Sequence, residues 1–296
     1  MPKLGIDLGG TKIEIVALDE RHETLFRRRI ATPRGDYAAT LQAVKALVDE
    51  AEGALGPGCS VGIGTPGAIS RRSGMLMNSN SVWLIGKPLK HDLEALLDRE
   101  IRMANDANCF ALSEAVDGAG QGAGVVFGVI LGTGVGGGIV VNGQVIEGAN
   151  AIAGEWGHNA LPWPEAGEWP GPRCYCGRSG CIETFLSGPG LARDHRETTG
   201  EDMTPETIAK RATAGDDRCE ATLARYEARL ARALAHVINI LDPEVIVLGG
   251  GLSNIARLYQ NVPRLWGRYV FSHDVATRLV MNKHGDSSGV RGAAGL

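Results

Sequence analysis

Two glycine-rich segments place the strongest constraint on how this chain can fold. Residues 5–18 read GIDLGGTKIEIVAL, and residues 128–141 read GVILGTGVGGGIVV. Each segment is an apolar strand, a Gly/Thr turn and a second apolar strand, which is the pattern of a β-hairpin. Because both segments follow the same pattern, they predict two related α/β domains that each present a Gly/Thr turn.

The spacing of apolar residues predicts further elements around the two hairpins. Strand-like runs predict strands at residues 3–8, 12–18, 60–64, 127–131, 139–141 and 245–248. Helical spacing predicts helices at residues 37–55, 110–116, 220–241 and 256–266. Thr204 begins another helix, and Asp92 is the expected cap of a helix that runs through Glu100.

The composition predicts a folded protein and excludes several classes. Glycine accounts for 42 of 296 residues, about twice its usual share of ~7%, without the period of three that collagen requires. Apolar residues make up 44% and charged residues 22%, which suits a full-sized core. The net charge of 30 − 34 = −4, without a long run of one sign, does not indicate a nucleic-acid partner.

The sequence also predicts no membrane partner. It holds no apolar run near the ~20 residues that span a bilayer, and its first residues do not follow the pattern of a secretory signal. We therefore expect a cytoplasmic protein.

Two common nucleotide-binding motifs do not fit the glycine segments. Residues 62–67 (GIGTPG) and 132–137 (GTGVGG) match G-x-G-x-x-G, but neither is followed by the helix that a dinucleotide fold requires. Residues 5–12 miss the P-loop pattern because Thr11 stands where that motif has lysine. The glycine segments therefore predict another kind of phosphate site.

Three glycine turns remain as candidates for phosphate binding, at residues 9–11, 132–138 and 249–251. Small residues let backbone N–H groups approach phosphate oxygens, and Thr11 and Thr133 add hydroxyl donors. Asp7 stands just before the first turn, where a carboxylate can hold Mg²⁺. The alternative is that these are ordinary hairpin turns with Asp7 as a turn acceptor; three such turns in one chain favour phosphate.

A cysteine cluster predicts a metal site. Cys174, Cys176 and Cys181 lie within eight residues, and His158 precedes them by sixteen positions. Three thiolates and one imidazole form the closed tetrahedral set that is typical of structural zinc. Closed coordination leaves no position for a zinc-activated water. Free or redox-active thiols are the alternative interpretation.

Polar residues near these motifs predict a site for a polyhydroxylated ligand. If a metal joins His158 to Cys181, then Glu155, His158 and Glu183 are drawn together. Carboxylate, amide and imidazole groups supply the donors and acceptors that sugar hydroxyls need. Asp106 is a further candidate, although it is also suited to cap a helix. The candidate ligand residues are Asn80, Asn105, Asp106, Glu155, His158 and Glu183.

Together these motifs resemble the ROK sugar kinases. The resemblance rests on DLGGTK at 7–12, ANDAN at 104–108, GTG at 132–134, GEWGH at 154–158, CYCGRSGCIE at 174–183 and LGGG at 248–251. Residues 78–88, 154–162 and 284–294 resemble especially the bacterial fructokinases of that family, which often also accept mannose.

The resemblance implies an actin-like ATPase fold, which is an α/β, ribonuclease H-like fold of two domains that close over ATP and sugar. The smaller domain is expected at residues 1–117 plus 288–296, and the larger at 118–287 with a small structural zinc site. Members of the family are commonly homodimers, and we expect the same here.

The resemblance also implies an ATP-dependent hexose kinase that converts D-fructose and ATP to fructose 6-phosphate and ADP. Asp106 would be the catalytic base that accepts the proton of the sugar hydroxyl. Asn80, Asn105, Glu155, His158 and Glu183 would read sugar hydroxyls, with His158 also on zinc. The expected ATP and Mg²⁺ residues are Asp7, Gly9, Gly10, Thr11, Lys12, Thr133, Gly134, Gly249 and Gly250, the last two beside the purine.

Several alternatives stay open at this point. Fructose, mannose, glucose and N-acetylated hexosamines differ by one or two contacts, so a glucokinase or an N-acetylhexosamine kinase is an alternative within the family. The ROK repressors are disfavoured because no DNA-binding segment precedes Gly9. A non-catalytic sugar sensor and an actin-like ATPase without a sugar substrate are alternatives of other classes.

Overall fold

The computed structural model describes all 296 residues and divides the chain into two compact units. The first unit comprises Met1–Gln121, Gly138–Ala153 and Asp286–Leu296, and the second comprises Gly122–Gly137 and Gly154–Gly285. Residues 138–153 lie in the first unit, while the domain bounds predicted from the sequence place them in the larger domain and stay a prediction. A Cβ atom at Gly138 would lie 2.5 Å from the carbonyl oxygen of Ala107, so only glycine lets this strand approach the helix there.

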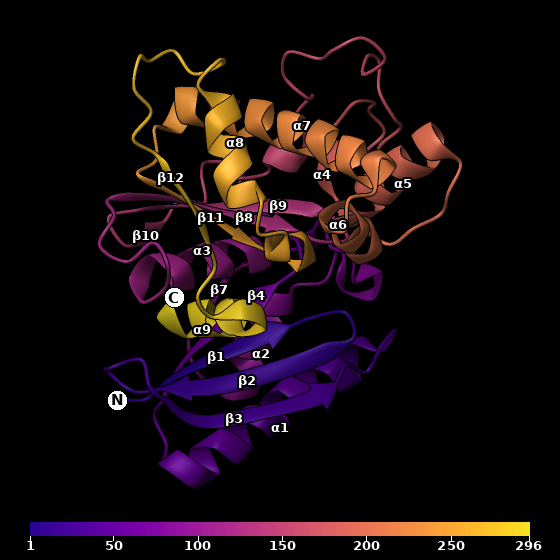
Figure 1. Ribbon diagram of the computed structural model, residues 1–296. Helices are drawn as coiled ribbons and strands as arrows, with labels where there is room; N and C mark the ends of the chain where they lie inside the picture. The colour runs from indigo at the N-terminus through magenta and orange to yellow at the C-terminus, as the bar shows by residue number, and fades with distance from the viewer. The chain divides into compact units, whose positions relative to one another are not determined.

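The first unit is built on a five-stranded mixed sheet in the order β3-β2-β1-β4-β7 (Figure 1). The strands are β1 (Lys3–Leu8), β2 (Lys12–Leu18), β3 (Thr24–Ala31), β4 (Ser60–Thr65) and β7 (Arg102–Asn105). β1 pairs antiparallel with β2 and parallel with β4, which in turn pairs parallel with β7. The hairpin expected at 3–18 is confirmed, and the strand expected at 60–64 extends by one residue.

Four helices belong to this unit: α1 (Tyr37–Leu55), α2 (Leu89–Leu97), α3 (Asp106–Val116) and α9 (Ser288–Gly295). Figure 1 shows α1 and α9 on opposite sides of the sheet. The unit also contains the short ribbon of β5 (Ala68–Ile69) and β6 (Leu76–Met77), and the 3₁₀ turns η1 (Val82–Leu84) and η4 (Gly285–Ser287). Most of η4 lies in the first unit, although Gly285 closes the second.

Two helix starts expected in this unit are wrong. Asp92 does not cap a helix, because α2 begins at Leu89 and the Asp92 carboxylate instead accepts a hydrogen bond from the Tyr37 hydroxyl at 2.7 Å. α3 begins at Asp106 rather than at residue 110, since the Asn105 side chain caps it by accepting from the Ala107 N–H. The second difference matters for function, because it places Asp106 in the first turn of a helix.

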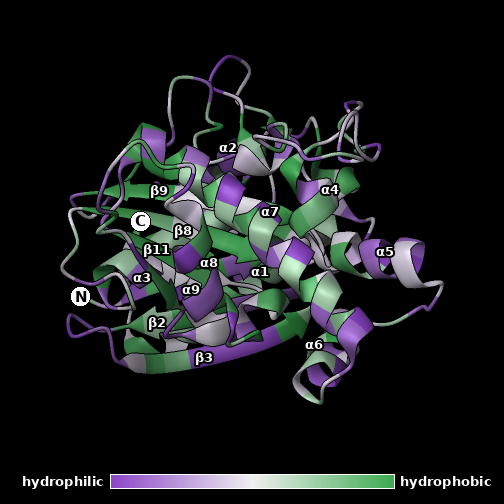
Figure 2. Ribbon diagram, turned by 45° about the horizontal axis from the view of Figure 1, so that its top comes forward, coloured by the Kyte–Doolittle hydropathy of each residue, from purple (hydrophilic) through white to green (hydrophobic).

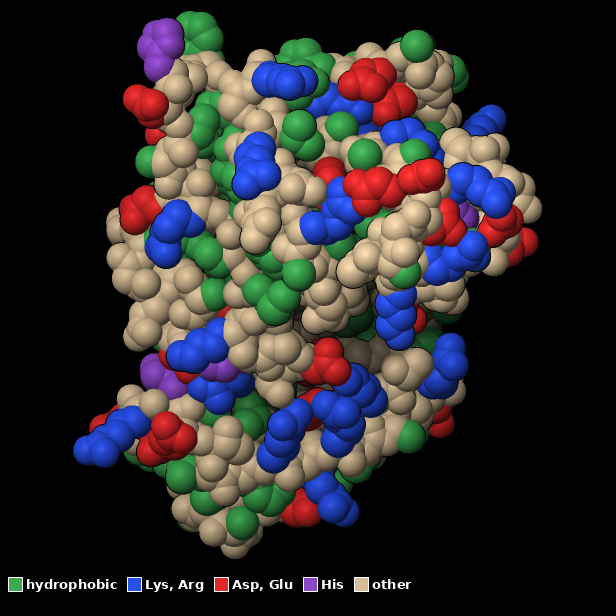
Figure 3. Space-filling view, viewed as in Figure 1, with side chains coloured by type: hydrophobic (Ala, Val, Ile, Leu, Met, Phe, Trp, Pro, Cys, Tyr) green, Lys and Arg blue, Asp and Glu red, His purple; other side chains and the backbone are tan.

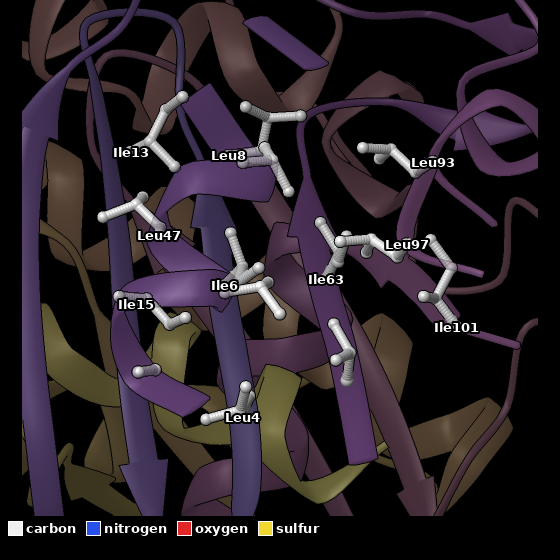
Figure 4. Packing of buried hydrophobic residues seen from close by; sticks show 14 of the residues in the cluster. Leu4, Ile6, Leu8, Ile13, Ile15, Leu47, Ile63, Leu93, Leu97 and Ile101 are labelled. Atoms are coloured by element: carbon white, nitrogen blue, oxygen red, sulfur yellow. The ribbon is translucent and has the colours of Figure 1, made fainter. Parts of the chain in front are cut away.

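The core of the first unit lies between the sheet and the helices α1 and α2. Leu4, Ile6 and Leu8 of β1 are fully buried there, with Ile13 and Ile15 of β2 beside them (Figure 4). Alternate residues of a strand point to opposite faces, so Gly5 and Asp7 point away from this core. The Asp7 side chain therefore lies on the opposite face of the sheet, near the end of β1.

The edge strand β3 is strongly charged. Figure 2 shows a hydrophilic stretch in the middle of this strand, where Arg27, Arg28 and Arg29 follow one another. Lys and Arg side chains gather over this part of the first unit in Figure 3. Arg27 and Arg29 hold the buried carboxylate of Glu14 at 2.6 and 2.8 Å. A charged edge of this kind prevents pairing with the strand of another molecule.

The second sheet repeats the arrangement of the first. Its order is β10-β9-β8-β11-β12, with β8 and β11 parallel and β11 and β12 parallel. The strands are β8 (Val125–Leu131), β9 (Val135–Val141), β10 (Gln144–Val145), β11 (Val245–Gly249) and β12 (Arg278–Met281). β9 begins four residues before the expected strand at 139–141, so the glycine turn is shortened to residues 132–134.

The helices of the second unit are α4 (Ile182–Leu186), α5 (Gly188–Thr199), α6 (Pro205–Thr213), α7 (Asp217–Leu241) and α8 (Leu258–Trp266), with the 3₁₀ turns η2 (Trp156–His158) and η3 (Gly251–Asn254). Thr204 caps α6 as expected, with its side chain accepting from the Thr207 N–H. α7 begins three residues earlier than expected because Asp216 caps it, and α8 begins two residues later. None of the helices is both long and apolar enough to span a bilayer.

Candidate active site and metal centre

The first glycine turn joins β1 to β2 and is held by several hydrogen bonds. The Gly9 N–H donates to the Lys12 carbonyl at 3.0 Å, and the Thr32 hydroxyl donates to the Gly9 carbonyl at 2.7 Å. A Cβ atom at Gly10 would lie 3.2 Å from the Ser81 Oγ and 3.8 Å from the Asn80 Oδ1. The structure therefore brings the exposed Asn80 against the turn that was expected to bind phosphate.

Asp7 occupies a position suited to a cation. It lies opposite Glu14 in the β1–β2 ladder, one residue before the strand ends. Burial raises the pKa of Asp7 to about 6; Lys12 opposes this shift, Glu14 adds to it and Arg29 opposes it. A buried carboxylate with a raised pKa gains stability from a nearby cation, which favours its ionised form. Mg²⁺ prefers oxygen ligands, so the Asp7 carboxylate beside the turn fits this cation.

Asp106 lies at the start of α3, immediately after β7. Its Oδ1 and that of Asn105 both accept from the Ala107 N–H at 2.8 Å. The positive end of the helix dipole stabilises a carboxylate in this position. The Asn105 Nδ2 donates to the Gly67 carbonyl at 3.1 Å, so the Asn105 amide also fixes the loop that follows β4.

Parallel pairing brings these residues together at one edge of the sheet, the edge formed by the carboxyl ends of β1, β4 and β7. β1, β4 and β7 run in the same direction, and Asp7, Gly64 and Ala104 lie in one row across them. Asp7 therefore stands at the same sheet edge as Asn105 and Asp106, the edge where ligands of open α/β sheets bind. The pKa of the buried Cys109 thiol is raised first by burial and then by the negative charges of Asp106 and Asp7. Both carboxylates therefore lie near this thiol.

The second glycine turn joins β8 to β9 and is held by Glu183. The Val135 N–H donates to the Glu183 Oε2 at 3.0 Å, and a Cβ atom at Gly134 would lie 2.6 Å from the same oxygen. The Gly188 N–H at the start of α5 donates to the Gly132 carbonyl at 2.8 Å. Glu183 was expected beside the metal cluster, and the structure shows that it also reaches this turn.

A cavity of about 930 Å³ opens beside the second turn within the second unit. Thr133 lines it together with Gly188 of α5, Pro205 and Glu206 of α6, and Gly251 of η3. Its size and largely apolar wall suit a nucleoside. The residues from α5 and α6 were missed in the sequence, where Thr204-Pro205-Glu206 was interpreted only as the start of a helix.

The third glycine turn, which is predicted to lie beside the purine, is shaped by its packing. Gly250 has φ of +81°, and a Cβ atom there would lie 2.5 Å from the Leu131 carbonyl oxygen. Gly250 is therefore required by its packing on β8, and Gly249 is the buried end of β11. The structure places Gly251, rather than Gly249 or Gly250, on the cavity wall.

The predicted metal ligands converge. One ligand atom from each of His158, Cys174, Cys176 and Cys181 lies within 4.8 Å of all the others. The His158 Nδ1 is 3.6 Å from the Cys174 Sγ, and the sulfur atoms of Cys176 and Cys181 are also 3.6 Å apart. Burial raises the pKa of Cys174, and it raises that of Cys181 to about 12. A divalent cation offsets this cost of ionising buried thiols, so the donor set fits zinc.

Local pairing explains how His158 reaches the cysteines. Ala160 forms a β-bridge with Cys181, and the Ile182 N–H donates to the Asn159 carbonyl at 2.8 Å. The segment is anchored at its other end by Trp156, whose indole N–H donates to the Gly136 carbonyl at 3.0 Å.

Glu155, His158 and Glu183 form the polar group that was expected from the sequence. Partial desolvation raises the pKa of Glu155; His158 lowers it and Glu183 raises it further, so the three side chains interact. Tyr175 is a fourth member that sequence reasoning missed. Its hydroxyl lies 3.0 Å from the His158 Nε2. Its place between two metal ligands in C-Y-C was the available signal.

The structure thus describes two groups of candidate residues, one in each unit. The first unit contains Asp7, Gly9, Gly10, Thr11, Lys12, Asn80, Asn105 and Asp106, and the second contains Thr133, Gly134, Glu155, His158, Glu183, Gly249, Gly250 and the cysteines. Mixed α/β sheets of matching order, each with a glycine turn, define a protein of the actin-like ATPase class.

Comparison with known proteins identifies the family. The model of the ROK family matches residues 3–296. The N-acetyl-D-glucosamine kinase of Photobacterium profundum is 43% identical over 296 residues, covering 99% of this chain and 98% of that protein. This chain belongs to the ROK family.

Two solved structures agree with this assignment. The ROK hexokinase from Thermus thermophilus is 30% identical, with a TM-score of 0.88 over 99% of this chain and 97% of that one. A ROK family glucokinase from Streptomyces griseus, in complex with glucose and AMPPNP, is 27% identical, with a TM-score of 0.77 over 99% and 98%. All three relatives are sugar kinases by name, and none of them is named a fructokinase.

Proposed function

We propose that this ROK sugar kinase transfers the γ-phosphate of ATP to the primary hydroxyl of a hexose, with Asp106 as the general base. The observation that carries the proposal is the position of Asp106 in the first turn of α3, at the same sheet edge as Asp7. A carboxylate at a helix N-terminus can orient the hydroxyl and accept its proton as the phosphate transfers.

Backbone N–H groups of the two glycine turns hold the phosphates in this proposal. Gly10 and Thr11 donate from the first turn, which the Gly9 N–H closes through its bond to the Lys12 carbonyl, and the Lys12 side chain follows it. Thr133 and Gly134 donate from the second turn. Such donors stabilise the charge that develops on the transferring group. Asp7 holds Mg²⁺, which neutralises phosphate charge when it is bound. The nucleoside occupies the cavity beside Thr133 and Gly251.

The hexose hydroxyls are assigned to Asn80, Asn105, Glu155, His158 and Glu183. Asn105 donates one amide hydrogen to Gly67 and accepts from Ala107, which leaves its second hydrogen for a sugar oxygen. The Cys₃His set is assigned to one structural zinc ion, which would hold His158 beside the cysteines. We also propose a homodimer, which light scattering tests.

Two acceptor sugars have specific support. N-Acetyl-D-glucosamine is favoured by the relatives at 40–43% identity, which bear that substrate in their names. D-Fructose, with mannose beside it, is favoured by the resemblance of residues 78–88, 154–162 and 284–294 to bacterial fructokinases. The relatives therefore weigh against the fructose preference that the sequence alone implied, and N-acetylglucosamine becomes the first candidate.

An ATP-coupled assay over N-acetylglucosamine, fructose, mannose and glucose tests the proposal. We expect ADP release that depends on one of these sugars, with phosphate found on its primary hydroxyl. ADP release without sugar would instead support an actin-like ATPase of another function. Sugar binding without phosphate transfer would support a non-catalytic sensor.

A further inference from the structure

Tyr175 is an exposed aromatic residue that is nevertheless held in place. Its exposed fraction is 83%, yet its hydroxyl lies 3.0 Å from the His158 Nε2. The two rings pack edge to face, with centroids 5.2 Å apart and planes at 84°. Exposed aromatic residues that stand singly need no explanation. Tyr175 differs because its hydroxyl and its ring both contact His158, a side chain that we assign to the hexose.

The geometry of His158 determines what Tyr175 can offer. The His158 Nδ1 faces the Cys174 sulfur, so the Nε2 is the nitrogen turned away from the cysteines. When Nδ1 serves as a metal ligand, Nε2 carries the ring hydrogen and donates it to the Tyr175 oxygen. The Tyr175 hydroxyl hydrogen then remains available to a second acceptor.

Tyr175 can both donate and accept a hydrogen bond, whereas its polar neighbours do only one of these. Ionised Glu155 and Glu183 only accept hydrogen bonds, and the His158 Nε2–H only donates. A phenol hydroxyl does both, and a sugar hydroxyl also needs one donor and one acceptor. An aromatic ring in addition covers the apolar face of a sugar while its polar end stays hydrated.

The metal segment, residues 174–181, fixes the backbone on both sides of Tyr175. Cys174 and Cys176 are both members of the ligand set. The Cys174 N–H donates to the Arg178 carbonyl at 2.8 Å, and the Gly177 N–H donates to the Cys174 carbonyl at 3.1 Å. Tyr175 is therefore presented from a tight turn rather than from a loose loop.

From these contacts we propose that Tyr175 binds the acceptor sugar and helps to determine which hexose is accepted. This inference rests on the proposed function of the same site. The Tyr175 oxygen shares the His158 Nε2–H with a sugar oxygen, the Tyr175 hydroxyl hydrogen bonds a sugar hydroxyl, and the Tyr175 ring covers the same part of the sugar. Phosphate transfer itself does not involve Tyr175, so its loss acts on binding and selectivity rather than on the chemical step.

The test compares Tyr175→Phe and Tyr175→Ala in the full chain, with kcat and KM for each accepted hexose and KM for ATP. We expect Tyr175→Phe to raise the hexose KM roughly 5- to 20-fold, with kcat and the ATP KM within about twofold, as for one lost hydrogen bond. Tyr175→Ala should raise it further. The ratio of kcat/KM between two hexoses should change in both variants.

Tyr269→Phe is the matched control, because the Tyr269 ring packs on Trp163 in the same unit and takes no part in the proposed site. It should leave every constant unchanged. Unchanged or lowered hexose KM values in Tyr175→Phe would overturn the inference. A KM increase that is accompanied by loss of bound zinc would also overturn it, because the effect would then act through the metal.

The same experiment separates this inference from the proposed function. If the unmodified chain phosphorylates no hexose, the proposed function fails. Calorimetric titration of the hexoses into the unmodified chain and Tyr175→Phe then still tests Tyr175: weaker binding in the variant supports the inference, and equal binding overturns it.

Discussion

The two glycine hairpins of this protein have the same backbone plan but different chemistry. In each sheet the first hairpin strand also pairs in parallel with a strand that has glycine in register, Gly64 opposite Asp7 and Gly249 opposite Ile130. The sequences align without a gap, so Asp7 of the first hairpin corresponds to Ile130 of the second. A carboxylate thus stands before one turn and an apolar side chain before the other.

The second turn obtains its carboxylate from elsewhere. Glu183 of α4 accepts from the Val135 N–H, at the end of the turn. Glu183 follows Cys181 by two residues, so its position depends on the metal segment. The first turn is instead held within its own sheet, where Thr32 of the segment after β3 binds the Gly9 carbonyl. The two turns therefore share a backbone plan, but the carboxylate comes from the hairpin itself in the first unit and from a segment distant in the sequence in the second.

The largest expected effect concerns the edge of the first sheet. Asp106→Asn removes the proposed base while keeping a side chain that can accept from the Ala107 N–H. We expect kcat to fall roughly 10³-fold, within the range for loss of a general base, while the hexose still binds. Steady-state kinetics and calorimetric titration with the hexose measure the two properties.

Asp98→Asn is a suitable control for this variant. Asp98 is an exposed carboxylate of the same unit in a left-handed conformation that asparagine tolerates. It should keep full activity. Near-normal kcat in Asp106→Asn would remove Asp106 from the base role and leave the first hairpin without its proposed catalytic partner.

The next effect tests the difference between Asp7 and Ile130 directly. Asp7→Asn should lower kcat/KM for MgATP roughly 10²-fold, because an amide holds Mg²⁺ more weakly than a carboxylate does. Ile130→Val, at the corresponding position of the second hairpin, should leave kcat/KM within about twofold and cost about 1 kcal/mol of stability. Equal losses in the two variants would mean that the hairpins serve phosphate in the same way.

Asp7 also predicts a pH dependence of stability in the protein without Mg²⁺ and ATP. Its folded pKa of about 6 lies above the ordinary value of 3.8, because burial disfavours the charged form. Between these values the folded chain binds a proton that the unfolded chain releases, so this group adds stability as the pH falls from 6 towards 4. Asp7→Asn should therefore raise Tm relative to the unmodified chain at pH 8, and this gain should shrink below pH 6.

A smaller effect on activity is expected from the metal segment. Cys181→Ser should remove the bound zinc, of which the unmodified chain should hold about one per chain. The hexose KM should then rise roughly tenfold or more, because His158 and Glu183 lose their support. Elemental analysis and kinetics measure these changes, with Cys59→Ser as a control, since Cys59 is a buried thiol of the first unit. A folded, fully active protein without metal would contradict the zinc assignment.

The sequence predicts the elements of this protein better than it predicts their contacts. Strong periodicity placed β1, β2 and α1 at their observed bounds, and the cysteine spacing indicated the Cys/His cluster that could hold a metal. It did not reveal that Gly138 packs on α3 or that Gly250 packs on β8, because such contacts join residues distant in the sequence. For the same reason α5 and α6 were not expected beside the second turn.

The smallest expected effect tests whether Glu183 links the metal segment to the second turn. Gly134→Ala adds a Cβ atom 2.6 Å from the Glu183 Oε2, so the carboxylate must move. Gly132→Ala adds a Cβ atom with no neighbour within 4 Å, in the same turn. We expect Gly134→Ala to raise the hexose KM roughly three- to tenfold, as for one weakened hydrogen bond, and Gly132→Ala to leave the hexose KM unchanged.

The two alanine variants distinguish two accounts of the second turn. If Glu183 belongs to the hexose, the effect of Gly134→Ala appears in the hexose KM and disappears when Glu183→Gln is already present, because the two substitutions act through one carboxylate. If the turn serves phosphate alone, both alanine variants alter the ATP KM and neither alters the hexose KM. The second result would mean that residues of the first unit make most of the contacts with the sugar. Glu183 would then only hold the start of β9 in place.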